Sequence, residues 1–334
     1  MNKQLNKLIL ILAMCFTLPN FAQASTGAMQ NHTAQQYGEL IKEISASLQE
    51  SFVIPEVTPA YAQALDQCLV SDCLAGVTEQ SKAAQKITEI MQAAHADKHL
   101  KVFAPGEKPG RRKKMASKGP GTDKPAKAKP SSPTGIEAVE ILSDNTGYIK
   151  ISSFPGTQAS LEATREALIS LQDTHTLVFD IRRHRGGTKT NISEIASFLF
   201  AQPTHMVTTQ SPHVNEGKAT PHVSAPNEYA DKFKDKPVFV LTSERSGSAA
   251  EHFAMAIKAT GRGILIGETT AGFGHWGGMV QLEQGYSLFL PVGRTYHPKT
   301  KLGWEGIGVT PDIIVPADDS LEYTLKRIHS PYSS

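Results

Sequence analysis

The sequence predicts an α/β fold with a largely parallel sheet, preceded by a small bundle of helices. Apolar residues recur at helical spacing between residues 32 and 94. After residue 135, short apolar runs typical of strands alternate with helical patterns. Two of these runs, 176–181 and 237–241, are apolar almost throughout, as buried strands are. Strands that alternate with helices favour a parallel sheet covered by helices.

The first 24 residues are typical of a secretory signal peptide. Lys3 and Lys7 precede the apolar run 8–18, and small residues allow cleavage after Ala24. The apolar run is too short to span a bilayer. The whole chain of 334 residues is 40% hydrophobic and 20% charged, the composition of a soluble globular protein. We therefore expect a periplasmic or secreted protein that keeps no transmembrane anchor after cleavage.

Residues 25–105 predict a helical subdomain. Apolar residues at helical spacing indicate a first helix over 32–52, and prolines at positions 55 and 59 end it. Two further helices are expected over 59–68 and 78–94. Three such helices make a small bundle, which is too thin to be a catalytic core alone. The alternating run 97–103, which contains His99, follows the bundle.

The mature chain contains two cysteines, Cys68 and Cys73, because Cys15 lies in the signal peptide. In an oxidising compartment this spacing favours a local disulfide. Two cysteines without a neighbouring pair of histidines make a poor zinc site. We therefore expect no metal and no other cofactor.

Residues 106–134 predict a flexible basic linker. Between positions 107 and 129, nine Lys or Arg residues accompany two acidic ones, whereas the whole chain carries a net charge of only +2. The segment has almost no large apolar side chain, so it cannot bury enough surface to offset its chain entropy. No aromatic residues are interleaved for stacking on bases, and we expect no nucleic-acid partner.

Residues 135–334 predict the α/β core. Strands are expected over 136–142, 147–152, 176–181 and 237–241, and helices around 161–171, over 191–200 and after residue 249. Runs at 264–266, 279–282 and 286–290 are expected to complete the sheet, with 312–315 at its edge.

A serine-rich turn separates the strand 237–241 from the helical pattern that follows it. Ser246 and Ser248 lie in this turn, where a hydroxyl is close to the positive end of the helix dipole and to free backbone N–H groups. A serine nucleophile needs this geometry. A serine that only caps the helix fits the same pattern.

Two other segments carry residues suited to catalysis. The segment 180–187 ends in Gly186-Gly187 at the carboxyl end of a buried strand, where α/β sheets bind their ligands. Adjacent glycines leave N–H groups free for an oxyanion, although a plain turn has the same pattern. The loop 304–312 places Glu305 between an aromatic residue and a glycine before the last strand.

Four elements in this order resemble the C-terminal-processing, or tail-specific, serine protease superfamily. They are DxRxxxGG at 180–187, SxSAAE at 246–251, GETTAG at 267–272 and EGIGVTPD at 305–312. The segments 97–100, 291–294 and 303–306 are similar to the branch of interphotoreceptor retinoid-binding protein. The resemblance implies a crotonase/Clp-protease-like ββα sheet core. It also implies a chain without the PDZ domain of the processing proteases, because 106–134 is too short and too polar for one.

The resemblance also implies roles for individual residues. The processing proteases activate their serine with a lysine, but Phe273 occupies that position here. The tricorn core protease, in the same superfamily, uses a histidine and a glutamate, and His99 and Glu305 match their places. The implied arrangement is Ser248 as nucleophile, His99 as general base and Glu305 as its orienting acid. Backbone N–H groups of Gly186 or Gly187, with that of Ala249, would bind the oxyanion.

Other interpretations of these residues remain open. His275, after the GETTAG segment, is an alternative base or a substrate contact. His252 lies one helical turn after Ser248, and His184 lies in the Gly-Gly loop. His99 and Glu305 are alternatively structural.

The function predicted is an exported serine hydrolase, in particular a peptidase that acts on peptides or proteins through an acyl-enzyme. The alternative is a non-catalytic binding protein for an apolar ligand of the retinoid or fatty-acid type. A third hypothesis is an interaction protein that works through its basic linker.

Overall fold

The computed structural model describes residues 22–107 and 132–329. Most of the predicted signal peptide, 1–24, and most of the basic linker, 106–134, lie outside the described residues. Among the helices that are described, none combines the length and the apolar character needed to cross a membrane. The described chain is mixed α/β with N-terminal helices, which confirms the predicted fold class.

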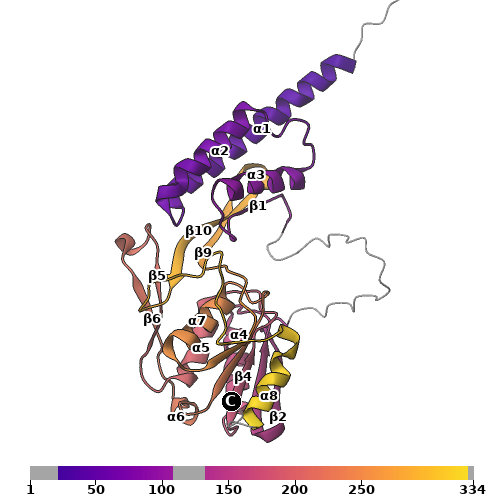
Figure 1. Ribbon diagram of the computed structural model, residues 1–334. Coiled ribbons are helices and arrows are strands. Elements are labelled where there is room, and N and C mark those ends of the chain that lie inside the picture. The colour runs from indigo at the N-terminus through magenta and orange to yellow at the C-terminus, as the bar shows by residue number, and fades with distance from the viewer. Residues whose placement is uncertain (1–21, 108–131, 330–334) are drawn as a thin grey trace, which may run out of the picture.

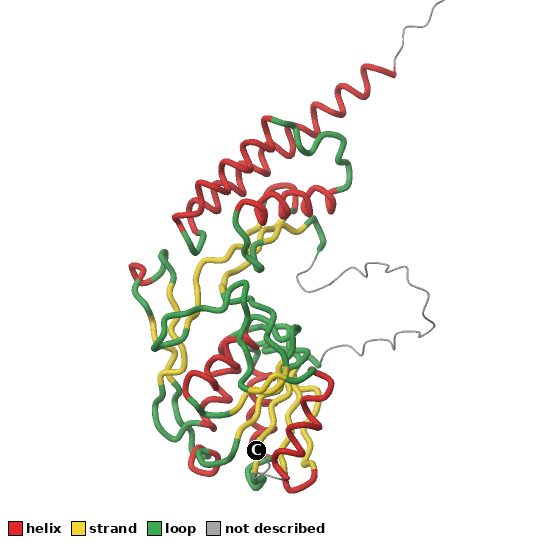
Figure 2. The backbone as a smooth tube through the Cα atoms, viewed as in Figure 1, coloured by secondary structure: helices red, strands yellow, loops and turns green. Residues whose placement is uncertain are grey.

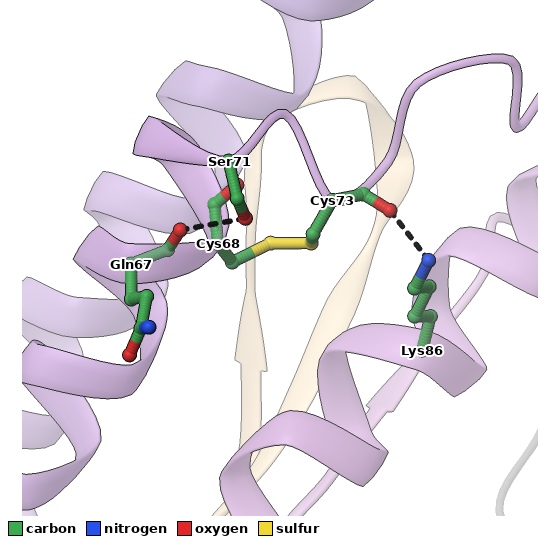
Figure 3. Close-up of a disulfide and its surroundings, with 5 residues drawn as sticks. All are labelled: Gln67, Cys68, Ser71, Cys73 and Lys86. Atoms are coloured by element: carbon green, nitrogen blue, oxygen red, sulfur yellow. Dashed lines mark hydrogen bonds between the residues drawn. A yellow bond between two sulfur atoms is a disulfide. The ribbon is translucent and has the colours of Figure 1, made fainter.

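The N-terminal part contains three long helices, as predicted. They are α1 (Ala22–Ser51), α2 (Thr58–Val70) and α3 (Gln80–Ala94), with a short 3₁₀ turn η1 (Pro55–Val57) after α1. Their apolar faces are buried at Leu40, Tyr61 and Ile87. Cys68, in the last turn of α2, forms a disulfide with Cys73 that closes the turn between them (Figure 3).

The main sheet has six strands in the order β11-β8-β7-β4-β3-β2. All neighbours are parallel except β2 and β3. The strands are β2 (Ile136–Leu142), β3 (Thr146–Ile151), β4 (Thr176–Asp180), β7 (Val238–Thr242), β8 (Ile264–Gly267) and β11 (Ile313–Ile314). The largely parallel sheet and its edge strand near 312–315 are therefore confirmed.

Helices cover both faces of the main sheet. Residues of α4 (Gln158–Ser170), α5 (Lys189–Leu199) and α7 (Ala249–Thr260) pack with one face into a single apolar core. Residues of α8 (Ser320–His329) pack on the other face. The remaining short elements are α6 (Ala230–Phe233) and the 3₁₀ turns η2 (Ser143–Asn145), η3 (Asn215–Gly217), η4 (Glu283–Gly285) and η5 (Ala317–Asp319).

A second sheet has five strands, and it corrects one prediction. It contains β1 (Lys101–Phe103), β5 (His205–Gln210), β6 (Thr220–Val223), β9 (His275–Gln281) and β10 (Ser287–Tyr296). The runs at 279–282 and 286–290 were expected to complete the main sheet, but they lie in β9 and β10 of this second sheet. An apolar run indicates a strand without indicating its neighbours, which depend on long-range pairing.

The second sheet joins the two halves of the chain. The N-terminal helices share an apolar core with Tyr286, Leu288 and Leu290, which lie at or near β10, and β1 pairs with β10. In Figure 1 the helices lie above β9 and β10, and the main sheet lies below them. Many loops gather between these two parts (Figure 2). The segment around His99 thereby contacts the loops between β8 and β11 of the chain, because Lys98 hydrogen-bonds to Ala271 and to Glu305.

Candidate active site

Ser248 lies in the turn between β7 and α7 and is the N-cap residue of α7. Its backbone has φ 58° and ψ −116°, in a region that glycine adopts readily and other residues adopt at a cost. Strain of this kind persists where the surroundings hold it, and it is common at functional sites. The turn therefore holds the Ser248 backbone in a strained conformation at the start of α7.

Glu251 holds the turn in place. Its carboxylate is fully buried and accepts hydrogen bonds from the backbone N–H groups of Ser248, Gly272 and Phe273 and from the hydroxyl of Thr270. Burial raises the pKa of Glu251 even though these four hydrogen bonds act to lower it. One carboxylate thus connects the serine turn to the loop after β8.

The Gly-Gly loop approaches Ser248 closely. A Cβ atom on Gly186 would lie 2.8 Å from the Cβ of Ser248, and one on Gly187 would lie 2.0 Å from the carbonyl oxygen of Phe154. Both glycines have positive φ, at 100° and 133°. A side chain at position 186 would push the loop away from Ser248, and one at position 187 would clash with the backbone of Phe154, so both positions require glycine.

The backbone N–H groups around Ser248 differ in their availability. The Gly186 N–H donates to Nδ1 of His184 at 3.0 Å. The N–H groups of Gly187 and Ala249 have no acceptor within the described chain. Ala249 is in the first turn of α7, where a helix leaves its N–H groups unpaired. Gly187 and Ala249 line one cavity together with Ser248.

His184 supports this loop from inside the protein. Its ring is fully buried and packs edge-on against Phe154, with 4.2 Å between the ring centroids. Burial lowers the pKa of His184 to about 3, so the ring is neutral and its Nδ1 accepts the Gly186 N–H. The ring is not part of the cavity lining.

Asp180, the first residue of the DxRxxxGG segment, also acts within the loop. Its carboxylate accepts hydrogen bonds from Tyr148 at 2.7 Å and from the guanidinium of Arg182 at 2.9 and 2.6 Å. Burial alone would raise the pKa of Asp180, but these hydrogen bonds outweigh it and lower the pKa. The arginine also donates to the carbonyl of Ala317, which ties the loop to the chain before α8.

Glu305 binds backbone groups of two other segments. One oxygen accepts the Lys98 N–H at 2.9 Å, and the other accepts the N–H groups of Gly274 and His275 at 2.7 and 2.9 Å. The structure thus brings Glu305 close to the His99 segment. No hydrogen bond between Glu305 and the His99 ring is found among the described residues.

Two imidazole rings occupy this region. His275, at the start of β9, shares a hydrogen bond of 2.7 Å between its Nδ1 and Oδ2 of Asp97, and it lines the cavity with Ser248. The His99 ring packs between Phe273 and Phe289, at centroid distances of 4.9 and 5.1 Å. Burial lowers the pKa of His99 to about 4.

Asp97 was not singled out in the sequence, yet it is held tightly. It is 1% exposed, and its Oδ1 accepts the N–H groups of His99 and Leu100. The side chain of Gln92 binds its backbone on both sides. In the sequence, its place in a DxH pattern is the one feature that could have pointed to Asp97, because His275, which it contacts, lies 178 positions away.

The acids and His275 are close enough to suggest a metal site. One ligand atom from each of Asp97, His275 and Glu305 lies within 4.8 Å of the others. However, both Glu305 oxygens and one Asp97 oxygen already accept backbone N–H groups. Donor N–H groups that point at the carboxylates compete with a cation, so the donor set fits backbone anchoring better than metal binding.

The cavity beside Ser248 has a volume of about 430 Å³ and a mostly apolar lining. Phe273, Trp276 and Trp304 contribute aromatic rings, and Val214 contributes an aliphatic side chain. His252 also lines it, but its Nε2 is hydrogen-bonded to Nδ1 of His222 at 2.9 Å. The cavity is large enough for a bulky apolar side chain of a ligand.

Comparison with known proteins connects these features to a family. Residues 145–315, more than half of the chain, match the model of peptidase family S41. Carboxyl-terminal-processing peptidase 3, chloroplastic, of Arabidopsis thaliana is 29% identical over 168 residues, which cover 50% of this chain and 31% of that protein. The carboxyl-terminal-processing protease of Picosynechococcus is 28% identical over 180 residues, covering 52% and 40%. This chain thus matches less than half of the length of these two relatives.

Solved structures share the fold over most of the chain. A lipoprotein from Streptococcus agalactiae has a TM-score of 0.56 and 14% identity, covering 96% of this chain and 100% of that one. The photosystem II D1 C-terminal processing protease has a TM-score of 0.53 and 16% identity, covering 84% and 93%. At these identities the likeness shows the fold alone, whereas the family model matches the sequence itself. The chain therefore belongs to peptidase family S41.

Proposed function

We propose that this protein is a serine peptidase in which Ser248 is the nucleophile. The observation that carries the proposal is the strained Ser248 turn beside the backbone N–H groups of Gly187 and Ala249, which have no acceptor in the described chain and line one cavity with Ser248. A nucleophile next to a preorganised pair of N–H donors is the arrangement that acyl transfer needs. Membership of a peptidase family supports peptides as the substrate class.

The chemistry follows from these positions. The Ser248 hydroxyl attacks the carbonyl carbon of the scissile peptide, and the N–H groups of Gly187 and Ala249 stabilise the resulting oxyanion. The amine then leaves, and water hydrolyses the acyl-enzyme. The Gly186 N–H, which was an alternative donor, is bound to His184 and acts within the loop instead. The resemblance implies His99 and Glu305 as base and orienting acid.

The cavity suggests which peptides are cleaved. Its lining is mostly apolar and aromatic, so a large apolar side chain next to the scissile bond would gain most from burial. Recognition by a separate peptide-binding domain is not needed for this selection. We therefore propose that substrate choice rests on this cavity.

Labelling with a fluorophosphonate probe and hydrolysis of labelled casein test the proposal. Wild-type protein should be labelled and should cleave casein, whereas Ser248→Ala should lose both by at least a thousandfold with an unchanged melting temperature. Ser246→Ala is the matched control, because the buried hydroxyl of Ser246 bonds only to backbone groups: it donates to the Ile181 carbonyl at 2.8 Å and accepts the Ser243 N–H at 3.0 Å in the described chain. Labelling that survives in Ser248→Ala and disappears in Ser246→Ala would reject Ser248.

Non-catalytic binding of an apolar ligand is a second candidate function, because the lining of the same cavity is mostly apolar. Solvent extraction of the purified protein distinguishes the two functions. A stoichiometric fatty acid or retinoid, together with intact casein after long incubation, would favour a carrier. A ligand-free protein that cleaves casein favours the peptidase.

We also propose that the protein is exported, as residues 1–24 predict. The disulfide between Cys68 and Cys73 supports an oxidising compartment. Cell fractionation with mass spectrometry of the N-terminus tests this directly. The protein should appear in the periplasm or medium and begin at Ser25, and an uncleaved cytosolic form would contradict export.

A further inference from the structure

The two histidines near Ser248 have different surroundings, and these surroundings decide which ring can move a proton. His275 lines the same cavity as Ser248, and its Nδ1 is bound to the buried carboxylate of Asp97. This contact fixes the proton on Nδ1 and leaves the lone pair on Nε2. An imidazole whose Nε2 has no hydrogen-bond partner in the described chain, and which lines the same cavity as a serine, is able to act as a general base.

His99 lacks these features. It is not part of the cavity lining, and its Nδ1 is buried without a hydrogen-bond partner in the described chain. No carboxylate therefore sets its tautomer or its orientation. With a pKa near 4, caused by burial, the ring is a weak base at neutral pH and is poorly matched to proton transfer there.

Two carboxylates lie close to the His275 ring. Asp97 lies 2.7 Å from Nδ1, and Glu305 lies 3.9 Å from the same atom. The neighbouring segment contributes His99 and the Lys98 ammonium, which donates to the carbonyl of Ala271. Both carboxylates are held by backbone N–H groups, so they are oriented before the reaction begins.

We propose that His275, oriented by Asp97, is the general base and acid of this enzyme. The inference rests on the proposed function, since it concerns the base that serves Ser248. As the Ser248 oxygen bonds to the carbonyl carbon, its proton moves to Nε2 of His275. The proton then passes to the leaving nitrogen as the C–N bond breaks. In the second half, His275 takes a proton from the attacking water and returns it to the Ser248 oxygen.

His99 and Glu305 are positioning residues in this scheme. The backbone N–H of His99 binds Asp97, and the Glu305 carboxylate binds the N–H of His275. Together they hold the acid and the base at the ends of two chain segments that are 178 positions apart. The His99 ring itself packs against Phe273 and Phe289.

Comparison of two matched variants tests the proposal in the full-length protein. His275→Gln should lower kcat for casein hydrolysis by at least a thousandfold, and His99→Gln should lower it by no more than tenfold. Asp97→Asn should lower kcat by about 10³- to 10⁴-fold with little change in KM. The amide oxygen has to stay with the N–H groups of His99 and Leu100, so the amide NH₂ faces Nδ1 of His275 and favours the wrong tautomer. The fluorophosphonate labelling rate should fall in the same order.

Chemical rescue separates a catalytic role from a structural one. Imidazole in the buffer should restore part of the labelling rate of His275→Ala and none of that of His99→Ala. A larger loss of kcat in His99→Gln than in His275→Gln would overturn the assignment and leave Ser248 as nucleophile. Activity that persists in Ser248→Ala would instead reject the proposed function. Near-ultraviolet circular dichroism of each variant shows whether it is folded. If His275→Gln does not fold, imidazole rescue of folded His275→Ala decides whether His275 is the base.

Discussion

The backbone N–H of Ser248 donates a hydrogen bond of 2.8 Å to the carboxylate of Glu251, three residues further along α7. The same carboxylate binds the loop that leads into His275. Ser248 and His275, the proposed nucleophile and base, therefore lie on two segments that share one buried anchor. Because that anchor is a carboxylate surrounded only by donors, its charge and its two acceptor oxygens are both needed.

Glu251→Gln should destabilise the protein and reduce its activity. The new NH₂ group must face donors that now bind an oxygen, which leaves at least one of them unsatisfied in a buried site. We expect a loss of about 2–4 kcal/mol in unfolding free energy and a fall in kcat of at least tenfold. Urea denaturation and casein hydrolysis measure the two effects.

Glu162→Gln is the matched control for that experiment. Glu162 is exposed and accepts one hydrogen bond from Gln158 on the surface of α4. The change should leave both quantities nearly unaltered. Equal stability of the Glu251 and Glu162 variants would show that Glu251 does not anchor the site.

Replacement of Ser248 should reveal the strain in its backbone. The backbone of Ser248 has φ 58° and ψ −116°, a conformation that is strained for alanine and not for glycine. Ser248→Gly should therefore be more stable than Ser248→Ala by about 1 kcal/mol, although glycine also gains entropy when unfolded. Both variants should be inactive. Thermal unfolding compares them.

The order of stability should reverse at Ser246. Ser246 is absent from the residues with positive φ, so glycine relieves no strain there. Ser246→Gly is then expected to be less stable than Ser246→Ala. If alanine is the more stable replacement at both positions, the Ser248 turn is not strained.

Much of the fold follows from local sequence. The runs at 176–181 and 237–241 are nearly continuous apolar segments, and they became the central strands β4 and β7. β5 and β6 were missed because they are short and their burial is uneven, so neither shows a clear alternation. The assignment of β9 and β10 to the main sheet was wrong, because strand patterns contain no information on partners.

In the candidate site, too, local contacts could be predicted from the sequence and long-range contacts could not. The SxSAAE turn has the spacing of a capping box, and Ser248 and Glu251 do pair locally. The pairing of Asp97 with His275 joins residues 178 positions apart, so no local pattern contains it. The order of the motifs along the chain, compared with that of the tricorn core protease, points to His99. The hydrogen bond and the cavity that favour His275 exist only after folding.

Gly293→Ala should change the cavity without touching Ser248. A Cβ atom there would lie 2.1 Å from Cζ2 of Trp276, so the indole must move, and the indole lines the cavity. We expect a stability cost of about 1–3 kcal/mol and a change of severalfold in KM for peptides with large apolar side chains. Steady-state kinetics on a series of such peptides measures this.

Gly278→Ala provides the control on the neighbouring strand. A Cβ atom at Gly278 would meet nothing within 4 Å. Its stability and KM should stay close to those of the wild type. If both alanine variants keep the wild-type KM, Trp276 does not contribute to substrate binding.

Acid should destabilise the folded protein through its buried, neutral histidines. Burial lowers the pKa of His184 and of His252 to about 3, whereas an unfolded histidine has a pKa of about 6.5. Between these values the unfolded chain binds protons that the folded chain does not, so unfolding free energy falls as the pH falls from about 6.5 toward 3. The stability that these neutral histidines contribute is complete above the unfolded pKa.

Urea denaturation between pH 7.5 and 4.5 should show this decline in unfolding free energy. The slope of unfolding free energy against pH gives the number of protons taken up on unfolding, and His184→Gln should reduce that number by up to one. A slope identical to that of the wild type would mean that His184 is protonated inside the folded protein, which its role as acceptor for the Gly186 N–H does not allow.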